Sequence, residues 1–248
     1  MNAPLVALAH GSRDPRSAAM IEDLVGEVRR CAPGLDVRTA FLDLSAPRLF
    51  DVLTALYAQG HRDAVVVPLL LGSAYHARVD IPGALSKAAQ RFPLLNLRVA
   101  DVLGPDPRLD DAVLLRLAEA GVPVDDPELG VVLTGAGSSH APANRAVSAV
   151  ARRLSRRTNW AGSVAAFAAA ADPDVPAAMA MLRARGARRI ALGSWFLAPG
   201  RLPDRVIDAA RAIDPHVRVA QPLGAAIADI VLDRYADALI AEDLSQYA

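Results

Sequence analysis

Three side chains that can bind a metal ion or carry a proton follow apolar runs of this 248-residue chain. Each run is predicted to be a strand: His10 follows residues 4–9, Asp43 follows residues 35–42, and His76 follows residues 63–70. Ligands of open parallel sheets bind beyond the carboxyl ends of the strands. We therefore expect the three side chains to meet at one sheet edge, where imidazole and carboxylate groups can do acid–base or metal chemistry. Asp43 taken alone also suits a turn or a helix cap.

The segments around these residues alternate between apolar runs and helical patterns. The runs of the first half are short and contain β-branched residues, as in parallel strands covered on both faces: 4–9, 35–42, 63–70 and 96–101. Between the runs, apolar residues recur at helical spacing, from Ile21 to Val28 and from Leu49 to Leu56. This order predicts an α/β fold with a parallel sheet flanked by helices.

The sequence repeats itself at a shift of about 126 residues. The coinciding landmarks are turn and strand residues: Gly11-Ser12 with Gly137-Ser138, Phe41 with Phe167, Pro47 with Pro173, and Gly60 with Gly186. Residues 121–130 are rich in Pro, Asp and Gly and are the predicted linker. We predict two similar α/β domains, residues 1–122 and residues 129–248.

The candidate residues of the first half have no counterparts in the second. Inert side chains stand at the equivalent positions: Ala136 for His10, Ala169 for Asp43, and Leu202 for His76. A purely structural role would not explain the loss of all three while the surrounding landmarks persist. The simplest interpretation is one active half and one inactive half.

Composition excludes several classes of protein. Hydrophobic residues make up 53% of the chain and charged residues 22%, so the chain is not disordered. Cys31 is the single cysteine, which excludes a disulfide framework and a cysteine-ligated zinc or iron–sulfur site within one chain. The formal net charge of +0 is unlike that of a nucleic-acid-binding protein. With no signal peptide or membrane-spanning run apparent, we expect a cytoplasmic protein.

Two other segments resemble functional motifs but do not complete their patterns or have a simpler interpretation. Gly135-Ala136-Gly137 begins like a dinucleotide-binding loop, but His140 stands where the third glycine belongs. The arginine-rich segment 152–157 is predicted to be the solvated face of a helix, with carboxylate binding as the alternative.

Three segments together resemble the signatures of the sirohydrochlorin chelatase family of the CbiX/SirB type: LVALAHGSRDPRS, AFLDLSAP and VPLLLGSAYHARVDIP. The resemblance covers nearly the whole chain, because long members of the family carry a duplicated second half. It implies the chelatase-like fold, with a cleft between two α/β domains. It also implies insertion of Fe²⁺ or Co²⁺ into sirohydrochlorin, for sirohaem or cobalamin synthesis.

The resemblance further implies which residues act. The two active-site histidines of the family match His10 and His76, and the acidic residue that helps to hold the metal matches Asp43. The family commonly has Glu at this position, so the carboxylate of Asp43 is one methylene shorter. Which histidine binds the metal and which accepts a proton stays open.

The substrate implied by the resemblance carries many carboxylates. Ser12, Arg13 and Arg78 lie next to the proposed histidines, and Arg201 and Arg205 occupy the equivalent edge of the second half. We expect them to bind the substrate, with the arginines using forked hydrogen bonds across the cleft.

The leading interpretation is therefore a sirohydrochlorin ferrochelatase. The alternatives are a cobaltochelatase of the anaerobic cobalamin pathway and a non-catalytic carrier of tetrapyrrole or metal. No cofactor beyond the substrate metal, Fe²⁺ or Co²⁺, is expected. The expected partners are sirohydrochlorin and a divalent metal, without nucleic acid or membrane, in a monomer or a homodimer.

Overall fold

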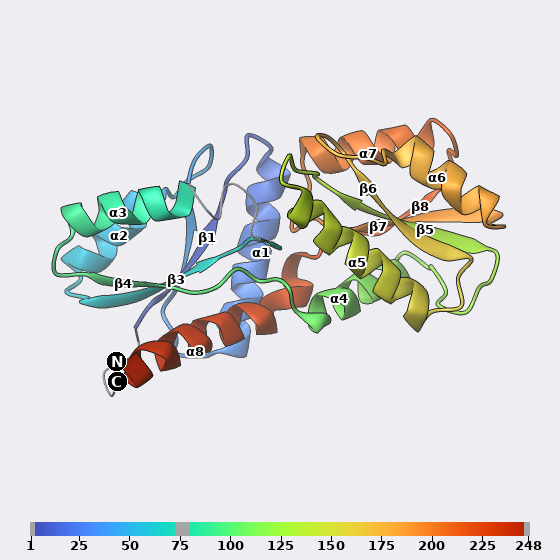
Figure 1. Ribbon diagram of the computed structural model, residues 1–248. Helices are drawn as coiled ribbons and strands as arrows, with labels where there is room; N and C mark the ends of the chain where they lie inside the picture. The colour runs from blue at the N-terminus through green and yellow to red at the C-terminus, as the bar shows by residue number, and fades with distance from the viewer. Residues whose placement is uncertain (1–2, 73–79, 246–248) are drawn as a thin grey trace. The chain divides into compact units, whose positions relative to one another are not determined.

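The chain forms two compact units, each built on a four-stranded parallel sheet (Figure 1). The computed structural model describes residues 3–72 and 80–245. The first sheet has the spatial order β2-β1-β3-β4, with strands Val37–Phe41, Leu5–Ala9, Asp63–Pro68 and Asn96–Val99. The second has the order β6-β5-β7-β8, with strands Gly162–Phe167, Leu129–Gly135, Arg189–Ser194 and Arg218–Val219. The predicted fold class is confirmed.

Helices cover both faces of each sheet (Figure 1). In the first unit, α2 (Leu49–Ala58) and α3 (Ile81–Arg91) pack on one face, and α1 (Pro15–Cys31) and α8 (Ala228–Ser245) on the other. In the second unit, α6 (Val175–Ala184) and α7 (Arg201–Arg211) face α4 (Pro107–Glu119) and α5 (Ala141–Arg157) across the sheet. A 3₁₀ helix, η2 (Gly224–Ile227), precedes α8. Covered on both faces, the central strand β1 is buried along its whole length.

Helix α1 shows how the sequence directs the local structure. Asp14 caps the helix by accepting a hydrogen bond from the backbone N of Arg16, and Pro15 occupies the first turn. Its apolar stripe is buried as predicted: Ile21, Leu24, Val25 and Val28. The helix therefore begins immediately after the loop that carries His10.

The compact units do not coincide with the two sequence repeats. The first unit contains residues 1–104 and 224–248, and the second contains residues 105–223. The last helix of each repeat thus packs in the unit built on the other repeat. The predicted boundary between residues 122 and 129 separates copies of the sequence, whereas the compact units divide near residues 104 and 224.

Specific hydrogen bonds hold each exchanged helix. On α8, the Arg234 guanidinium donates to the backbone oxygens of Val102 and Leu103, both at 3.0 Å. On α4, Asp110 accepts hydrogen bonds from Arg153 of α5 at 2.5 and 2.8 Å. These contacts tie each helix to the unit in which it packs.

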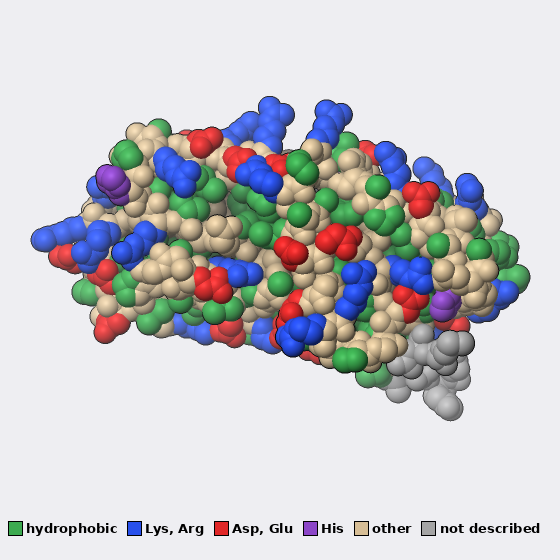
Figure 2. Space-filling model, turned by 180° about the vertical axis from the view of Figure 1, so that it is seen from behind, with side chains coloured by type: hydrophobic (Ala, Val, Ile, Leu, Met, Phe, Trp, Pro, Cys, Tyr) green, Lys and Arg blue, Asp and Glu red, His purple; other side chains and the backbone are tan. Residues whose placement is uncertain are grey.

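The arginine-rich segment 152–157 lies on helix α5, where Arg153 and Arg157 are 42% and 44% exposed and also bind carboxylates. Arg153 pairs with Asp110, whose side chain is only 3% exposed, and Arg157 pairs with Asp111. Both acids lie on α4, more than 40 residues earlier in the sequence. Basic and acidic side chains are interspersed over the face shown in Figure 2, as the zero net charge suggests.

No helix within residues 3–72 and 80–245 combines the length and the apolar character needed to cross a lipid bilayer.

Candidate metal centre

Backbone hydrogen bonds bring His10 and Asp43 together at the carboxyl ends of β1 and β2. Leu42 N donates to Ala9 O at 3.0 Å, and Asp43 N donates to His10 O at 3.0 Å. These bonds continue the parallel β1–β2 pairing beyond the last residues of both strands. The two residues are therefore direct neighbours, although 33 positions separate them in the sequence.

The loop after β1 requires a glycine directly after His10. Gly11 has φ +96°, and a Cβ atom built on it would lie 1.7 Å from the backbone oxygen of Asp43. No side chain fits in that space, and the positive φ suits glycine. The close contact of the two loops thus depends on Gly11.

A hydroxyl group links the same two loops. Ser45 Oγ accepts a hydrogen bond from Ser12 N at 3.1 Å and donates to Ser12 O at 2.9 Å. The backbone of Ser45 also donates to Asp43 O at 2.7 Å, in a turn where Leu44 has φ 62°. Ser12 Oγ accepts from Asp14 N at 3.1 Å, which leads the chain into α1.

The two proposed ligands differ in exposure. His10 is half-buried, and its Nδ1 atom is shielded from solvent. The side chain of Asp43 is 58% exposed, and its Oδ1 lies 3.5 Å from Nη2 of Arg48. Exposed ion pairs are weak, so the carboxylate can exchange Arg48 for another cation.

A positive charge also lies close to the start of α1. The Arg16 side chain donates hydrogen bonds to Asp14, and this holds the pKa of that carboxyl below its usual value. Asp14 is thereby committed to capping α1. We therefore do not count it among the metal ligands.

Two predicted site residues, His76 and Arg78, lie outside the described residues. Within the part of the chain that the structure describes, no three His, Cys, Asp or Glu side chains form a group able to hold a metal ion. The structure thus brings together His10 and Asp43, and the three-ligand arrangement stays a prediction.

The predicted substrate-binding residues occupy different surroundings. Arg13 is exposed in the loop between His10 and α1. Ser12 uses its backbone N and O and its hydroxyl within the loop. In the second unit, Arg201 is exposed at the start of α7, and Arg205 donates to the backbone oxygen of Ala168, just after β6, at 3.3 Å. Their role in binding substrate stays a prediction.

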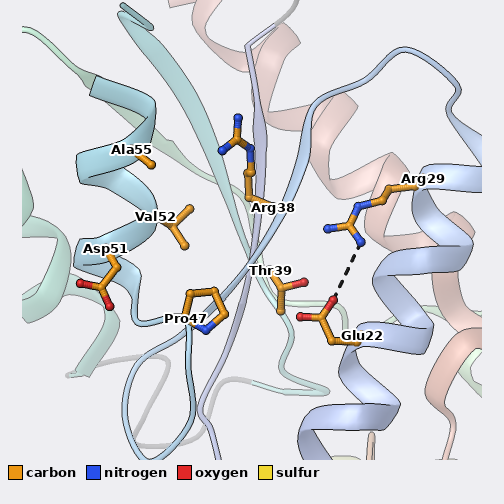
Figure 3. A pocket seen from close by; sticks show the side chains of 8 residues that line it. All are labelled: Glu22, Arg29, Arg38, Thr39, Pro47, Asp51, Val52 and Ala55. Atoms are coloured by element: carbon orange, nitrogen blue, oxygen red, sulfur yellow. Dashed lines mark ion pairs between the residues drawn. The ribbon is translucent and has the colours of Figure 1, made fainter. Parts of the chain in front are cut away.

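A cavity of about 330 Å³ lies at the outer edge of β2, between α1 and α2 (Figure 3). Arg29 donates to the backbone oxygen of Val37 at 2.9 and 3.0 Å, and Arg38 donates to Asp36 at 2.6 and 2.8 Å. Figure 3 shows Glu22 beside Arg29, with 3.8 Å between their charged atoms. Strand β2 lies at the edge of the first sheet, and these side chains flank its unpaired side.

Sequence reasoning missed Ser45 and Arg48. Both follow Asp43 within five positions, and this closeness to a proposed ligand could have drawn attention to them. Their partners, Ser12 and Asp43, could be identified only after the β1–β2 pairing was known.

Comparisons with known proteins identify relatives of the chain and bear on the repeat. A profile of the CbiX family matches residues 4–120 and again residues 130–238, which confirms the repeat. The chain is 27% identical over 202 residues to a sirohydrochlorin ferrochelatase of Priestia megaterium, covering 80% of this chain and 74% of the relative. It is 25% identical over 202 residues to a sirohydrochlorin cobaltochelatase of the same organism, covering 80% and 65%.

A solved structure agrees with these sequence relatives. SirB from Bacillus subtilis with Fe³⁺ superposes with a TM-score of 0.79 at 25% identity, covering 98% of both chains. The names of these relatives are those of metal chelatases, as the sequence motifs predicted. Because the family profile covers both repeats, this chain belongs to the CbiX family.

Proposed function

We propose that this chain is a sirohydrochlorin chelatase that inserts a divalent metal into the tetrapyrrole, in sirohaem or cobalamin synthesis. Two relatives named for this activity support the proposal. The observation that carries it is the backbone hydrogen bond from Asp43 N to His10 O, which makes a histidine and an aspartate neighbours at the carboxyl ends of β1 and β2. Fe²⁺ is the metal we favour, and Co²⁺ is the alternative suggested by the cobaltochelatase relative.

The reaction exchanges two protons for one metal ion. Two pyrrole N–H bonds break, two protons leave, and the metal forms bonds to the ring nitrogens. A neutral imidazole can bind a first-row metal or accept one of these protons near neutral pH. Because Nδ1 of His10 is shielded, we assign this task to its Nε2 atom. The oxidation state of the metal does not change, so we infer that no other cofactor is needed.

The carboxylate of Asp43 would complete a mixed nitrogen and oxygen ligand set. Iron and cobalt both accept such a set. Few protein ligands leave coordination positions for the tetrapyrrole nitrogens. His76 is the proposed second histidine, on the strength of its motif in the sequence.

Arginine side chains are proposed to bind the substrate carboxylates. Guanidinium groups form paired hydrogen bonds with carboxylates. Arg13 is exposed close to His10, and Arg201 is exposed on the second unit. Arg78, Arg205 and Ser12 complete the proposed set, and loss of any one arginine should raise KM for the tetrapyrrole more than it lowers kcat.

The experiment is an anaerobic absorbance assay with sirohydrochlorin and Fe²⁺ or Co²⁺. The wild-type chain should turn over many times, and His10→Ala should lower kcat/KM by about 100-fold or more. His216→Ala is the matched control, because His216 is an exposed histidine beyond α7, and it should leave activity unchanged. Stoichiometric colour change without turnover would identify a carrier instead.

The same assay decides between the metals. Comparing kcat/KM for Fe²⁺ and Co²⁺ on identical protein should give the larger value for Fe²⁺. A larger value for Co²⁺ would favour the cobaltochelatase alternative.

A further inference from the structure

The side chain of Ser45 spans from the loop after β2 to the loop after β1. Its hydroxyl accepts from Ser12 N and donates to Ser12 O, so one group satisfies both backbone atoms of a residue 33 positions away. The backbone of Ser45 is bound in turn to Asp43 O. Each end of this connection lies two residues from a proposed metal ligand, His10 at one end and Asp43 at the other.

The second repeat holds its equivalent loop in a different way. There, Asn144 of α5 accepts from Ser138 N at 2.9 Å and donates to Ser138 O at 2.7 Å. Ala171 stands where the first repeat has Ser45. The second arrangement ties a loop to the helix that follows it, whereas Ser45 ties two loops to each other.

The fold itself does not require the link between loops. Gly137 has φ +81° and Gly11 has φ +96°, while Ala170 has φ 57° and Leu44 has φ 62°. The second repeat therefore reaches the same backbone shape without a hydroxyl across the loops. The link occurs in the repeat that retains the histidine and the aspartate.

We propose that Ser45 is a positioning residue that fixes the separation of His10 and Asp43 for metal binding. This inference rests on the proposed function and names a residue that serves the same site. Metal ligands depend on the hydrogen bonds that orient them, and loss of such bonds weakens binding measurably. The hydroxyl acts here through the backbone, by limiting how far the two loops can separate.

The test compares Ser45→Ala with Asn144→Ala, which removes the equivalent clamp from the inactive repeat. Co²⁺ is titrated onto each purified chain, and binding is followed by the visible absorption of protein-bound cobalt. Ser45→Ala should raise the Kd for Co²⁺ about 10-fold and lower chelatase kcat/KM in parallel. Asn144→Ala should leave the Kd for Co²⁺ and the chelatase kcat/KM within about twofold of the wild-type values, although it removes as many hydrogen bonds as Ser45→Ala does. Thermal unfolding shows whether the two variants lose comparable stability.

Two further variants separate the effect of the hydroxyl group from the effect of side-chain volume at position 45. Thr and Val have nearly the same shape, and only Thr keeps a hydroxyl. Ser45→Thr should retain Co²⁺ affinity and Ser45→Val should lose it, which keeps the test valid if Ser45→Ala does not fold. Equal Kd values for the Thr and Val variants, or equal effects of Ser45→Ala and Asn144→Ala, would overturn the positioning role.

His10→Ala distinguishes this inference from the proposed function. If His10→Ala binds Co²⁺ and turns over like the wild type, the proposed function fails. If His10→Ala loses Co²⁺ binding and turnover while Ser45→Ala keeps Co²⁺ binding and turnover, the proposed function stands and the role of Ser45 is refuted.

Discussion

In both repeats, the chain leaves the first two strands through loops of the same backbone shape. Asp43 N donates to His10 O at 3.0 Å in the first repeat, and Ala169 N donates to Ala136 O at 3.1 Å in the second. In each repeat, a glycine with positive φ follows the first strand and lies against the backbone of the loop that follows the second strand. The side chains differ completely, since an imidazole and a carboxylate are replaced by two methyl groups. The loop shape is thus a property of the fold, and the chemistry is carried by side chains that the fold can lose.

The two exchanged helices, α8 and α4, can also be compared by the contacts that hold them. The first unit holds α8 by hydrogen bonds from Arg234 to backbone oxygens and from Tyr235 to Ala3 O. Burial raises the pKa of Tyr235, which keeps its hydroxyl protonated as a donor. The second unit uses an ion pair between Arg153 and a buried carboxylate. On α4, Arg116 also donates to the backbone oxygen of Leu223 at 2.9 and 3.3 Å. Both units therefore use arginine donors to backbone oxygens, and the second unit adds an ion pair with a buried carboxylate.

Alanine in place of either loop glycine should be among the most destabilising changes. A Cβ atom would lie 1.7 Å from a backbone oxygen at Gly11 and 1.8 Å at Gly137. Each substitution should therefore destabilise its unit by about 3 kcal/mol, measured by urea unfolding. Among molecules that remain folded, Gly11→Ala alone should lose chelatase activity. If Gly137→Ala is tolerated, the common loop shape is not a requirement of the fold.

The ion pair on α4 should respond unequally to removal of its partners. Arg153→Ala leaves a buried carboxylate without its guanidinium and should lower the free energy of unfolding by about 3 kcal/mol. Asp110→Ala leaves Arg153, which is 42% exposed and can be hydrated, so the loss should be nearer about 1 kcal/mol. Urea unfolding of both variants gives the comparison. Equal losses would show that the burial of Asp110 is not what makes the pair important.

Exchange of the acidic residue tests the chemical difference between the repeats. Asp43→Ala should raise the Kd for Co²⁺ about 10-fold, and Asp43→Glu should retain binding because it keeps the charge. Ala169→Asp restores only the carboxylate to the second repeat and should create no second cobalt site. Cobalt titration measures all three, and a new site in the Ala169→Asp chain would contradict the need for histidine.

Removal of Arg48 should have a smaller effect in the opposite direction. Its guanidinium competes with the metal for Asp43, in an exposed pair at 3.5 Å. Because such pairs contribute about 0.5 kcal/mol, Arg48→Ala should tighten Co²⁺ binding about twofold. Arg211→Ala, at an exposed arginine at the end of α7, is the control and should change nothing. Weaker binding in Arg48→Ala would show that Arg48 supports the metal site.

The smallest effect is a pH dependence confined to the first unit. Hydrogen bonds from Arg38 hold the pKa of Asp36 below its usual value, against the opposing effect of burial. A lowered carboxyl pKa stabilises the folded chain above the usual carboxyl pKa, and this stabilisation is lost as the pH falls through the folded-state pKa. Gly162 and Val164 occupy these positions in the second repeat. Asp36→Asn should therefore flatten the loss of stability below about pH 4, and an unchanged pH profile would contradict this.

Much of the fold could be predicted because its signals are local. The predicted strand 4–9 is observed as Leu5–Ala9, and 63–70 as Asp63–Pro68, since buried parallel strands appear as nearly continuous apolar runs. The buried stripe of α1 follows from the spacing of its apolar residues. The exchange of α4 and α8 could not be predicted, because an amphipathic pattern shows that one face is buried and not which sheet covers it.

By itself, the sequence determined the order of strands and helices, the repeat, and the positions of His10 and Asp43 after two strands. Those properties depend on periodicity and spacing along the chain. Only the tertiary structure decided that Asp43 N donates a hydrogen bond to His10 O, that Ser45 is hydrogen-bonded to Ser12, and that Arg153 pairs with Asp110. Such contacts depend on which strands lie side by side and which helix covers which sheet. Packing of the whole chain selects them, because each joins residues that are more than 30 positions apart.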